Sequence, residues 1–374
     1  RRGLELHAWF NPFHARHAAA KSPIASTHIS KTRPDLVRKY GPLLWLDPGE
    51  PLVHDHSLRV ILDVVRRYDV DGVHLDDYFY PYPEKTAAKQ VIPFPDDPSW
   101  RRYQKAGGKL TRDDWRRDNV NRFVQRLFTN VKAEKRWVKV GISPFGIWKP
   151  GHPPGVRGMD ATQEIYADSL KWFRAGWLDY LAPQLYWSID APEQSFPALL
   201  KWWTGQNAAA RHLWPGLSAA AIGPARNADE IIQQLKLIRT QPGAGGSLQW
   251  SIKVLHQNRD GLADKLVRQV FPTPALIPAS PWLDKAVPGK PIVAFGQDAA
   301  ATTSVFRWEL PGGGAPGWWL VQMRFTGQWR TELVPGGQAT RTLTGGNGVL
   351  PEVIAVAAVS RFGQLGSAFV AQRA

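Results

Sequence analysis

Residues 70–81 read Val70-Asp71-Gly72-Val73-His74-Leu75-Asp76-Asp77-Tyr78-Phe79-Tyr80-Pro81. The first half has the alternation of a β-strand, in which successive side chains point to opposite faces. Gly72, His74 and Asp76 then share one face, and the apolar side chains between them share the other, which can pack on helices. Two adjacent carboxylates, three aromatic residues and a proline follow at once. A strand that ends in this way predicts a functional site at its carboxyl end.

The same unit, a short apolar strand followed by a loop and an amphipathic helix, recurs on both sides of this stretch. The expected strands are Leu4–Phe10, Val70–Asp76, Val138–Ser143, Asp179–Trp187, Trp214–Ala220 and Ser247–Ile252. The expected helices are Pro34–Tyr40, Ser57–Tyr68, Arg112–Arg136, Thr162–Ala175, Pro192–Thr204, Ala228–Thr240 and Gly261–Val270. Six βα units in series predict parallel strands joined by helical crossovers.

The order of these units predicts an α/β fold of the TIM (β/α)8 barrel type. Polar and aromatic residues gather in the loops after the strands, as in such barrels. A doubly wound sheet is less favoured, because no glycine-rich nucleotide loop follows the first strand. A complete barrel has eight units, so we expect this chain to be a fragment that lacks the first two. The barrel domain is expected over residues 1–272.

The character of the sequence changes after residue 270. Residues 271–291 hold six prolines, and 273–285 are expected to form a proline-rich linker. Short β-rich runs separated by glycines then predict a small antiparallel sandwich over residues 286–374. The expected strands are Thr302–Leu310, Trp318–Phe325, Trp329–Val334, Thr340–Thr344 and Pro351–Ser360. Residues 352–366 resemble the closing strand pair of fibronectin type III domains.

Composition narrows the function. The chain has 374 residues, 43% of them hydrophobic, and a formal net charge of +15, which favours an anionic partner. Nucleic acid is a minor candidate, since the basic residues are scattered and no binding motif is present. Without cysteine, disulfides and thiolate metal sites are impossible. The 18 tryptophans favour a carbohydrate or another ligand that stacks on flat rings.

Chemistry is expected at the carboxyl ends of the barrel strands. Asp76 and Asp77 are the catalytic candidates. The expected substrate-binding residues are His7, Trp9, Asn11, His74, Tyr78, Tyr80, Gln184, Tyr186 and Trp187. His74 shares a face with Asp76 and is a candidate for setting the pKa of that carboxyl. We expect no cofactor and no metal: His7, His74 and Asp76 could converge, but their spacing matches no ligand motif.

Several long motifs, in order, resemble the glycosyl-hydrolase-like family 10 proteins. They are Leu4–Pro12, Asp71–Pro81, Ile142–Trp148, Tyr166–Asp168 and Gly176–Trp187. These relatives are bacterial envelope lipoproteins that include glycosidases cutting peptide-free peptidoglycan strands. The resemblance implies a (β/α)8 barrel, hydrolysis of cell-wall glycan, and a periplasmic or cell-envelope location with a lipid anchor outside this chain.

The sequence allows more than one catalytic mechanism. Residues 71–78 resemble strand four of family 18 chitinases, but His74 replaces an Asp and Tyr78 replaces the catalytic Glu. They also resemble the strand-four end of α-amylases, with Asp76 as nucleophile, and the adjacent acids of family 20 hexosaminidases, in which the substrate acetamide attacks. Our hypothesis makes Asp76 the nucleophile or acetamide orienter and Asp77 the acid/base or a substrate ligand. Glu164 or Asp160 is the alternative second acid.

Two other functions fit the same residues. A non-catalytic carbohydrate-binding barrel would hold sugar with the same acids and aromatic rings. An α-glucan hydrolase of amylase type would cut a neutral polymer, whereas the positive net charge favours an anionic wall glycan.

Overall fold

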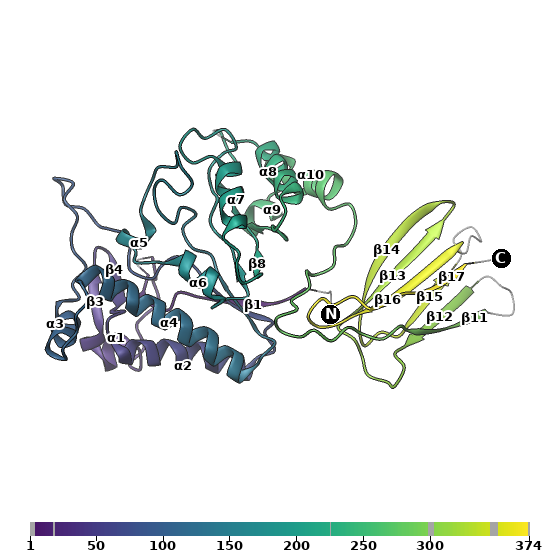
Figure 1. Cartoon of the computed structure of the whole chain (residues 1–374), viewed down its shortest axis with the longest axis horizontal. Coiled ribbons are helices and arrows are strands. Elements are labelled where there is room, and N and C mark those ends of the chain that lie inside the picture. Colours follow the sequence, from purple (N-terminus) through teal and green to yellow (C-terminus); the bar gives the residue numbers. More distant parts are fainter. Residues whose placement is uncertain (1–3, 18, 225, 298–302, 345–350, 373–374) are drawn as a thin grey trace. The chain divides into compact units, whose positions relative to one another are not determined.

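The computed structural model describes residues 4–17, 19–224, 226–297, 303–344 and 351–372 (Figure 1). The chain divides into two compact units. One is Leu6–Lys265, and the other includes Leu266–Ala374. Among the described residues, no helix is long and apolar enough to cross a membrane.

A five-stranded parallel sheet forms the centre of the first unit, and four of its strands lie at expected positions, whereas β8 precedes the expected strand Trp214–Ala220. Its order is β1-β5-β6-β7-β8, and every neighbouring pair is parallel. A shorter parallel pair, β9-β10, continues the array, because Gln184 just after β7 bridges to Gly216 of β9. The strands are β1 (His7–Phe10), β5 (Gly72–Leu75), β6 (Lys139–Ile142), β7 (Tyr180–Leu181), β8 (His212–Leu213), β9 (Gly216–Leu217) and β10 (Leu248–Gln249).

The strands of this array do not close into a ring within the described residues. β1 and β10 lie at its two ends and share no strand pairing there. Trp9 of β1 and Trp250, which follows β10, nevertheless touch edge to face, with ring centroids 5.7 Å apart. The two ends therefore come close at the carboxyl side of the strands, although no hydrogen-bonded ladder joins them.

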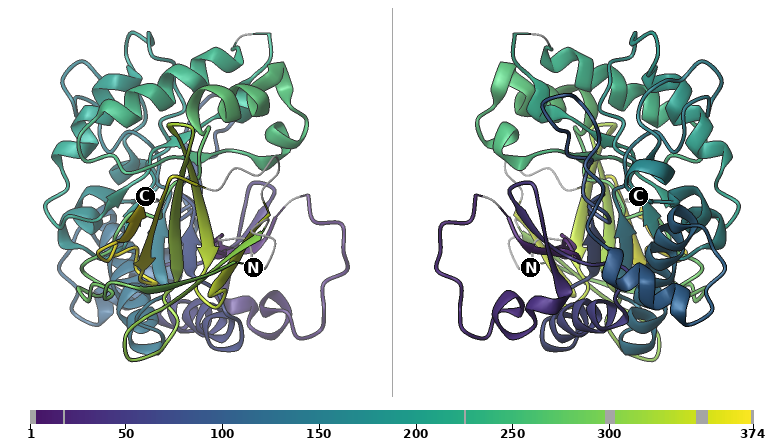
Figure 2. Two further views of the ribbon diagram at one scale, coloured as in Figure 1. Left: turned by 90° about the vertical axis from the view of Figure 1, so that its right-hand side faces the viewer. Right: turned by 90° about the vertical axis from the view of Figure 1, so that its left-hand side faces the viewer.

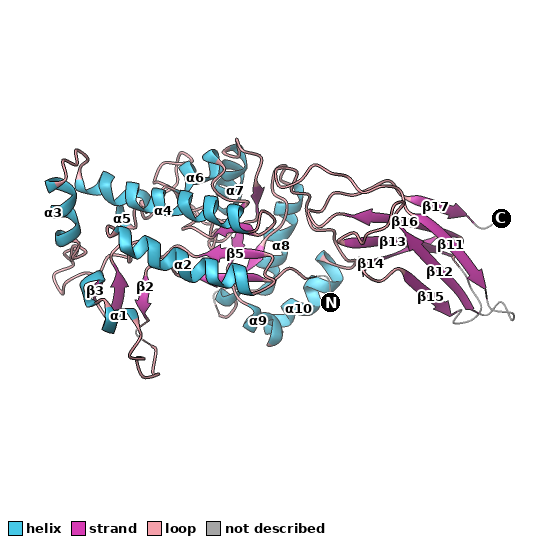
Figure 3. Ribbon diagram, turned by 90° about the horizontal axis from the view of Figure 1, so that it is seen from below, coloured by secondary structure: helices cyan, strands magenta, loops and turns pink. Residues whose placement is uncertain are grey.

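Helices link successive strands and lie outside the parallel sheet (Figures 1 and 2). The longer ones are α2 (Pro51–Arg67), α3 (Asp97–Lys105), α4 (Arg112–Glu134), α7 (Phe196–Gly205) and α8 (Ala228–Thr240). The shorter ones are α1 (Ile29–Thr32), η1 (Pro34–Leu36), α5 (Ala161–Glu164), α6 (Ser169–Ala175), η2 (Ala219–Ala221), α9 (Ile252–His256), η3 (Arg259–Gly261) and α10 (Leu262–Lys265). α2 and α4 pack side by side (Figure 3).

Local sequence explains where two of these helices begin. Thr111 caps α4 by accepting a hydrogen bond from the backbone N–H of Asp114, and Asn227 caps α8 through Glu230 N–H. Along α2, Val53, Leu58, Ile61, Leu62 and Val65 are buried while the intervening charged residues face solvent.

Two expected helices are wrong in part. Residues 34–40 form only the single turn η1, and Val37–Tyr40 is strand β3, whose Tyr40 hydroxyl donates to the carbonyl of Ile92. The expected helix Thr162–Ala175 is two helices, α5 and α6. Tyr166 between them has a positive φ of 56°, which no α-helix allows, and Asp168 caps α6.

A small antiparallel sheet, which the sequence did not predict, lies between β1 and α2. Its order is β2-β4-β3, with β2 at His14–Arg16 and β4 at Leu43–Leu46. Trp45 of β4 is fully buried and donates its Nε1–H to the carbonyl of Phe79, in the loop after β5. This sheet therefore supports the loop that carries the two adjacent carboxylates.

The second unit begins with the helical turn η4 (Leu266–Val270) and continues as a sandwich of two antiparallel sheets. One has the order β11-β12-β15 and the other β14-β13-β16-β17. The strands are β11 (Ile292–Gln297), β12 (Thr303–Glu309), β13 (Trp318–Phe325), β14 (Gln328–Pro335), β15 (Thr340–Thr344), β16 (Val353–Val359) and β17 (Phe369–Gln372). The described residues after 291 form strands, turns and loops without a helix (Figure 3). Phe306 and Trp308 of one sheet pack with Trp319, Val321 and Val356 of the other in a shared core.

Candidate active site

A cavity of about 590 Å³ opens at the carboxyl ends of the parallel strands. Of the residues predicted for the site, eight line it: His7, Trp9, His74, Asp76, Asp77, Tyr78, Gln184 and Tyr186. They come from the ends of β1, β5 and β7, which lie far apart in sequence and meet because the sheet is parallel.

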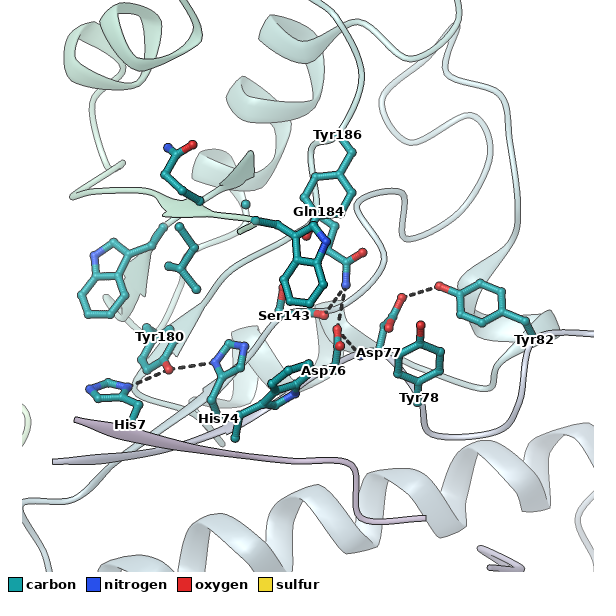
Figure 4. A pocket seen from close by; sticks show the side chains of 16 residues that line it. His7, His74, Asp76, Asp77, Tyr78, Tyr82, Ser143, Tyr180, Gln184 and Tyr186 are labelled. Atoms are coloured by element: carbon teal, nitrogen blue, oxygen red, sulfur yellow. Dashed lines mark hydrogen bonds between the residues drawn. The ribbon is translucent and has the colours of Figure 1, made fainter. Parts of the chain in front are cut away.

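The two adjacent carboxylates lie together on one side of this cavity (Figure 4). Asp76 Oδ1 accepts a hydrogen bond from Gln184 Nε2 and another from the backbone N–H of Asp77, each 3.0 Å long. Asp77 is only 4% exposed, and its Oδ2 accepts a hydrogen bond from the Tyr82 hydroxyl. Gln184 also donates to the carbonyl of Ser143, which fixes its amide in place. The pair is thus rigidly held.

Burial raises the pKa of both acids. The pKa of Asp76 rises to about 7, first through burial and then through the adjacent charge of Asp77, while the Gln184 hydrogen bond opposes the rise. Burial also raises the pKa of Asp77, and the hydrogen bond from Tyr82 works against it. Two such acids do not both ionise readily, so the pair tends to share a proton close to neutral pH.

Three rings from three strands join across the floor of the cavity. The Tyr180 hydroxyl lies 2.9 Å from Nδ1 of His7 and 2.9 Å from Nδ1 of His74 (Figure 4). A phenol has one proton to donate, so one imidazole accepts it and the other donates its own Nδ1–H. Burial, followed by the nearby His7, lowers the pKa of His74 to about 4, so this ring is neutral at pH 7.

Glycines on the inward face make room for these rings. In the strand register His7 is opposite Gly72, and Tyr180 is opposite Gly141. A Cβ on Gly72 would lie 2.5 Å from His7 Nδ1, and one on Gly141 would lie 1.8 Å from Tyr180 Cζ. The glycines thus let large side chains lie sideways over the neighbouring strand.

The expected role of His74 toward Asp76 is not what the structure shows. Burial, Asp77 and Gln184 shift the pKa of Asp76, whereas His74 directs its Nδ1 at Tyr180. His74 shares the inward face with Asp76, as the alternation predicted, but its ring belongs to the floor of the cavity.

Three residues predicted to bind substrate do not line the cavity. Tyr80 is 1% exposed and packs edge-on against Phe94 and Tyr166, so its predicted contact with substrate is corrected to a core role. The chain leaves the extended conformation after β5 and bends at Asp77, so Tyr80 is not held on the strand face that carries Asp76. Asn11 lies beyond the end of β1, and the ring of Trp187 packs edge-on against Phe145 instead.

The alternative second acids lie elsewhere. Asp160 caps α5 by accepting from the backbone N–H groups of Thr162 and Gln163, and neither Asp160 nor Glu164 lines the cavity. Ser143 does line it, but its hydroxyl donates to the carbonyl of Ala182.

The remaining lining residues were not predicted: Tyr82, Tyr180, Trp214, Gly216, Leu248, Gln249 and Trp250. Tyr180 was recognisable, since it starts the alternating inward series that contains Gln184 and Tyr186. Tyr82 lies in an irregular loop, where no periodicity identifies its direction. In the described part of the chain no group of three or more His, Asp or Glu residues is arranged to hold a metal ion.

Comparison with known proteins confirms the family resemblance. The family model described as "Glycosyl hydrolase-like 10" matches residues 1–233. The chain is 38% identical over 306 residues to "Glycosyl hydrolase YngK" of Bacillus subtilis (strain 168), which covers 78% of this chain and 58% of that protein. It is 34% identical over 218 residues to "Glycosyl hydrolase DigH" of Escherichia coli (strain K12), covering 54% of this chain and 47% of that protein.

The chain thus spans about half the length of the curated relatives it matches. Among solved structures it is similar to the PgaB (BpsB) glycoside hydrolase domain from Bordetella bronchiseptica. That match has 13% identity and a TM-score of 0.47, over 70% of this chain and 74% of that one. The family model covers well over half of the present sequence, and the chain therefore belongs to the glycosyl hydrolase-like 10 family.

Proposed function

We propose that the protein is a glycoside hydrolase that cuts bacterial cell-wall glycan, with peptidoglycan strands free of peptide as substrate. The observation that carries this proposal is the rigid pair Asp76 and Asp77 at the edge of an aromatic-lined cavity. Membership of a glycosyl hydrolase-like family supports it. The net charge of +15 suits an anionic wall polymer, so binding should weaken as salt rises.

The geometry favours Asp76 as the general acid. It is the more exposed of the two, and its pKa of about 7 leaves a substantial protonated fraction near neutral pH, where an acid catalyst works best. In the proposed reaction Asp76 gives its proton to the glycosidic oxygen as the bond from C1 to that oxygen breaks. Afterwards its carboxylate takes a proton from the attacking water.

Asp77 then has the task of orienting the substrate acetamido group. Its carboxylate is buried and held by Tyr82, which suits a group that accepts the acetamido N–H. The acetamido carbonyl oxygen attacks C1, forming a cyclic oxazolinium that water opens, with net retention of configuration. This assignment exchanges the two roles of the hypothesis drawn from the sequence, because the structure gives the buried position to Asp77.

Tyr78 and Tyr186 supply hydroxyl groups around the two acids. Burial, followed by the charges of the two aspartates, raises the pKa of both phenols, so both stay protonated and able to donate. Hydroxyls of this kind suit sugar hydroxyls, and the faces of the rings suit sugar C–H groups.

The test is the release of new reducing ends from purified, peptide-free glycan strands. Wild-type protein should release them, and Asp76→Asn and Asp77→Asn should each lower the rate by at least about 100-fold while remaining folded. Asp190→Asn, which changes an exposed carboxylate outside the cavity, is the matched control and should keep the wild-type rate. Retention of the strands without any new reducing ends would mean a binding barrel. Full activity of both variants would remove the two acids from the mechanism.

We further propose that the sandwich is a fibronectin type III-type module and that the protein works in the cell envelope, where its substrate lies. Sheets of three and four antiparallel strands around a tryptophan-rich core support the first statement. A module of this type serves as a spacer or as a docking surface rather than as a catalyst. Trp329→Ala, on the exposed surface of β14, should therefore leave the rate of hydrolysis unchanged.

A further inference from the structure

His74 uses only one of its two ring nitrogens in the folded protein. Nδ1 lies 2.9 Å from the hydroxyl of Tyr180, whereas Nε2 points away from Tyr180 and into the cavity (Figure 4). No residue that the structure describes makes a hydrogen bond with Nε2. Nε2 is also not one of the unpaired polar atoms that are shielded from solvent. A ligand in the cavity therefore has access to this nitrogen.

The ring of His74 is held in position before any ligand arrives. It stacks on Tyr180 with the ring centroids 5.8 Å apart and the planes 14° apart. Tyr180 in turn stacks on Trp214 and lies over Gly141, where a Cβ would have no room. His7 Nδ1 contacts the same Tyr180 hydroxyl at 2.9 Å. The direction of Nε2 is thus fixed by packing, which lowers the entropic cost of binding a ligand there.

The hydrogen bond at Nδ1 determines what Nε2 can offer to a ligand. Burial lowers the pKa of His74 to about 4, so near neutral pH the imidazole is neutral and carries one N–H. If Nδ1 accepts the Tyr180 proton, Nε2 carries the N–H and donates; if Nδ1 donates, Nε2 accepts. A hydroxyl group completes either arrangement, since it both donates and accepts. This nitrogen therefore suits the hydroxyl group of a sugar.

His74 also lies close to the carboxylates. It precedes Asp76 by two residues on the inward face at the end of β5, which separates their Cα atoms by roughly 6–7 Å. Trp9 is opposite His74 in the strand register, is 51% exposed and lines the same cavity. An exposed indole offers a flat surface for the apolar face of a sugar. The carboxylic acid, the indole and the free nitrogen thus come from two adjacent strands, within reach of a single sugar unit.

We propose that His74 is a substrate-binding residue whose Nε2 forms a hydrogen bond with a hydroxyl group of the sugar unit beside Asp76. Tyr180 and His7 are then positioning residues, because they hold the ring that presents Nε2. The place of this sugar unit at the cleaved bond rests on the proposed function, whereas the contact between Nε2 and a sugar hydroxyl does not. The substrate contact expected of His74 from the sequence thereby gains a specific atom and a support.

Two amide substitutions separate the nitrogen that faces the ligand from the nitrogen that is anchored. The amide of asparagine reaches about as far as Nδ1 of histidine, so His74→Asn keeps a partner for Tyr180 and loses the group at Nε2. The amide of glutamine reaches about as far as Nε2, so His74→Gln keeps a hydrogen-bonding group that faces the cavity. A role of His74 in packing alone would not distinguish the two variants.

The first experiment measures binding by calorimetry in the Asp76→Asn background, where turnover is suppressed. The probe is a tetrasaccharide prepared from peptide-free glycan strands. We expect His74→Asn to weaken binding roughly tenfold and His74→Gln to weaken it distinctly less. His256→Asn, at an exposed position on α9, is the matched control and should bind the probe as tightly as the parent protein.

The nitrogen resonances of the His74 ring give a second readout. When the tetrasaccharide is added to ¹⁵N-labelled Asp76→Asn protein, the Nε2 resonance should shift more than the Nδ1 resonance, because the partner of Nδ1 stays the same. The positioning role of Tyr180 is tested by a double-mutant cycle. Tyr180→Phe should weaken binding when residue 74 is histidine and should change it little when His74→Leu is already present.

The possible results decide the matter. An unchanged affinity of folded His74→Asn, equal losses in His74→Asn and His74→Gln, or an Nε2 resonance that does not move overturns the contact. A tetrasaccharide that does not bind at all overturns it as well. Additive effects of Tyr180→Phe and His74→Leu overturn the positioning role of Tyr180. Binding that depends on His74 in a protein that never releases reducing ends leaves the contact standing and overturns the hydrolase.

Discussion

The ring of Tyr180 lies across Gly141 of the neighbouring strand, so closely that a Cβ on Gly141 would come within 1.8 Å of the phenol carbon Cζ. The same phenol holds both His7 and His74 through its hydroxyl group. One missing side chain on β6 therefore sets the position of three rings on the floor of the cavity.

Gly141→Ala should destabilise the first unit by about 1–3 kcal/mol, because the new methyl group overpacks a buried position that cannot open outward. The free energy of unfolding in urea measures this change. Gly205→Ala is the matched control: its Cβ meets nothing within 4 Å, and it lies in the last turn of α7. If Gly141→Ala is as stable as the control, the packing of Tyr180 against β6 is less tight than described.

The pH dependence of hydrolysis should reflect Asp76. With a pKa of about 7, the acid loses its proton as pH rises, so kcat/KM should fall above about pH 7. Gln184→Met removes a hydrogen bond that lowers this pKa, and the alkaline limb should move to higher pH. An alkaline limb at the same pH in both proteins would argue that another group supplies the proton.

The stability of the protein should depend on the same carboxyl. The folded-state pKa of Asp76 is raised above its unfolded value of 3.8, so the folded state binds the proton more tightly. The stability this contributes is fully present below about pH 4 and is lost as pH rises through about 7. Asp76→Asn avoids that loss, so its advantage over wild type should be larger at pH 8 than at pH 4, by on the order of 2 kcal/mol.

Thermal melting at the two pH values checks this expectation. Asp190→Asn, at an exposed position, is the control for the loss of one carboxyl group. If the stability of Asp76→Asn relative to wild type is the same at pH 4 and pH 8, the Asp76 carboxyl is better solvated than its surroundings indicate.

Arg116→Met should be strongly destabilising. The guanidinium is 7% exposed and donates to both carboxylate oxygens of Asp96, which is fully buried, and to the hydroxyl of Tyr166. Losing it leaves Asp96 with Arg112 as its remaining cation, so we expect a cost of about 3 kcal/mol in unfolding free energy. Arg101→Met on the exposed face of α3 should change stability by less than about 0.5 kcal/mol. Similar losses at the two positions would contradict the buried role of Arg116.

Regular elements were predictable where the pattern was local. The bounds of β13 and β15 match the expected strands Trp318–Phe325 and Thr340–Thr344, and α8 matches Ala228–Thr240. The small sheet before α2 was not predicted, and its β2 pairs with β4 across residues 17–42, which hold a loop, α1, η1 and β3. Pairing between strands far apart in sequence leaves little trace in either one.

The residues of the candidate site were likewise predictable only where the pattern was local. The strand alternation correctly placed His74 and Asp76 on one face, and the inward series placed Gln184 and Tyr186 near them. Tyr80, predicted to bind substrate because it follows the carboxylate pair, is buried in the core, because the chain bends at Asp77. The alternation could not show that Tyr180 holds one nitrogen of His74 and leaves the other facing the cavity, because that depends on what surrounds each atom in space.

By itself, then, the sequence determined the parallel βα order of the first unit, the β-rich character of the second, and the carboxylate pair at the end of residues 70–76. These follow from side-chain periodicity, which the local backbone geometry imposes. Only the tertiary structure decided that Asp77 is buried against Tyr82, that burial raises the pKa of Asp76, and that Tyr180 links two histidines. Burial, pKa and unpaired polar atoms are properties of the surroundings, and those are assembled from strands that meet only in the folded protein.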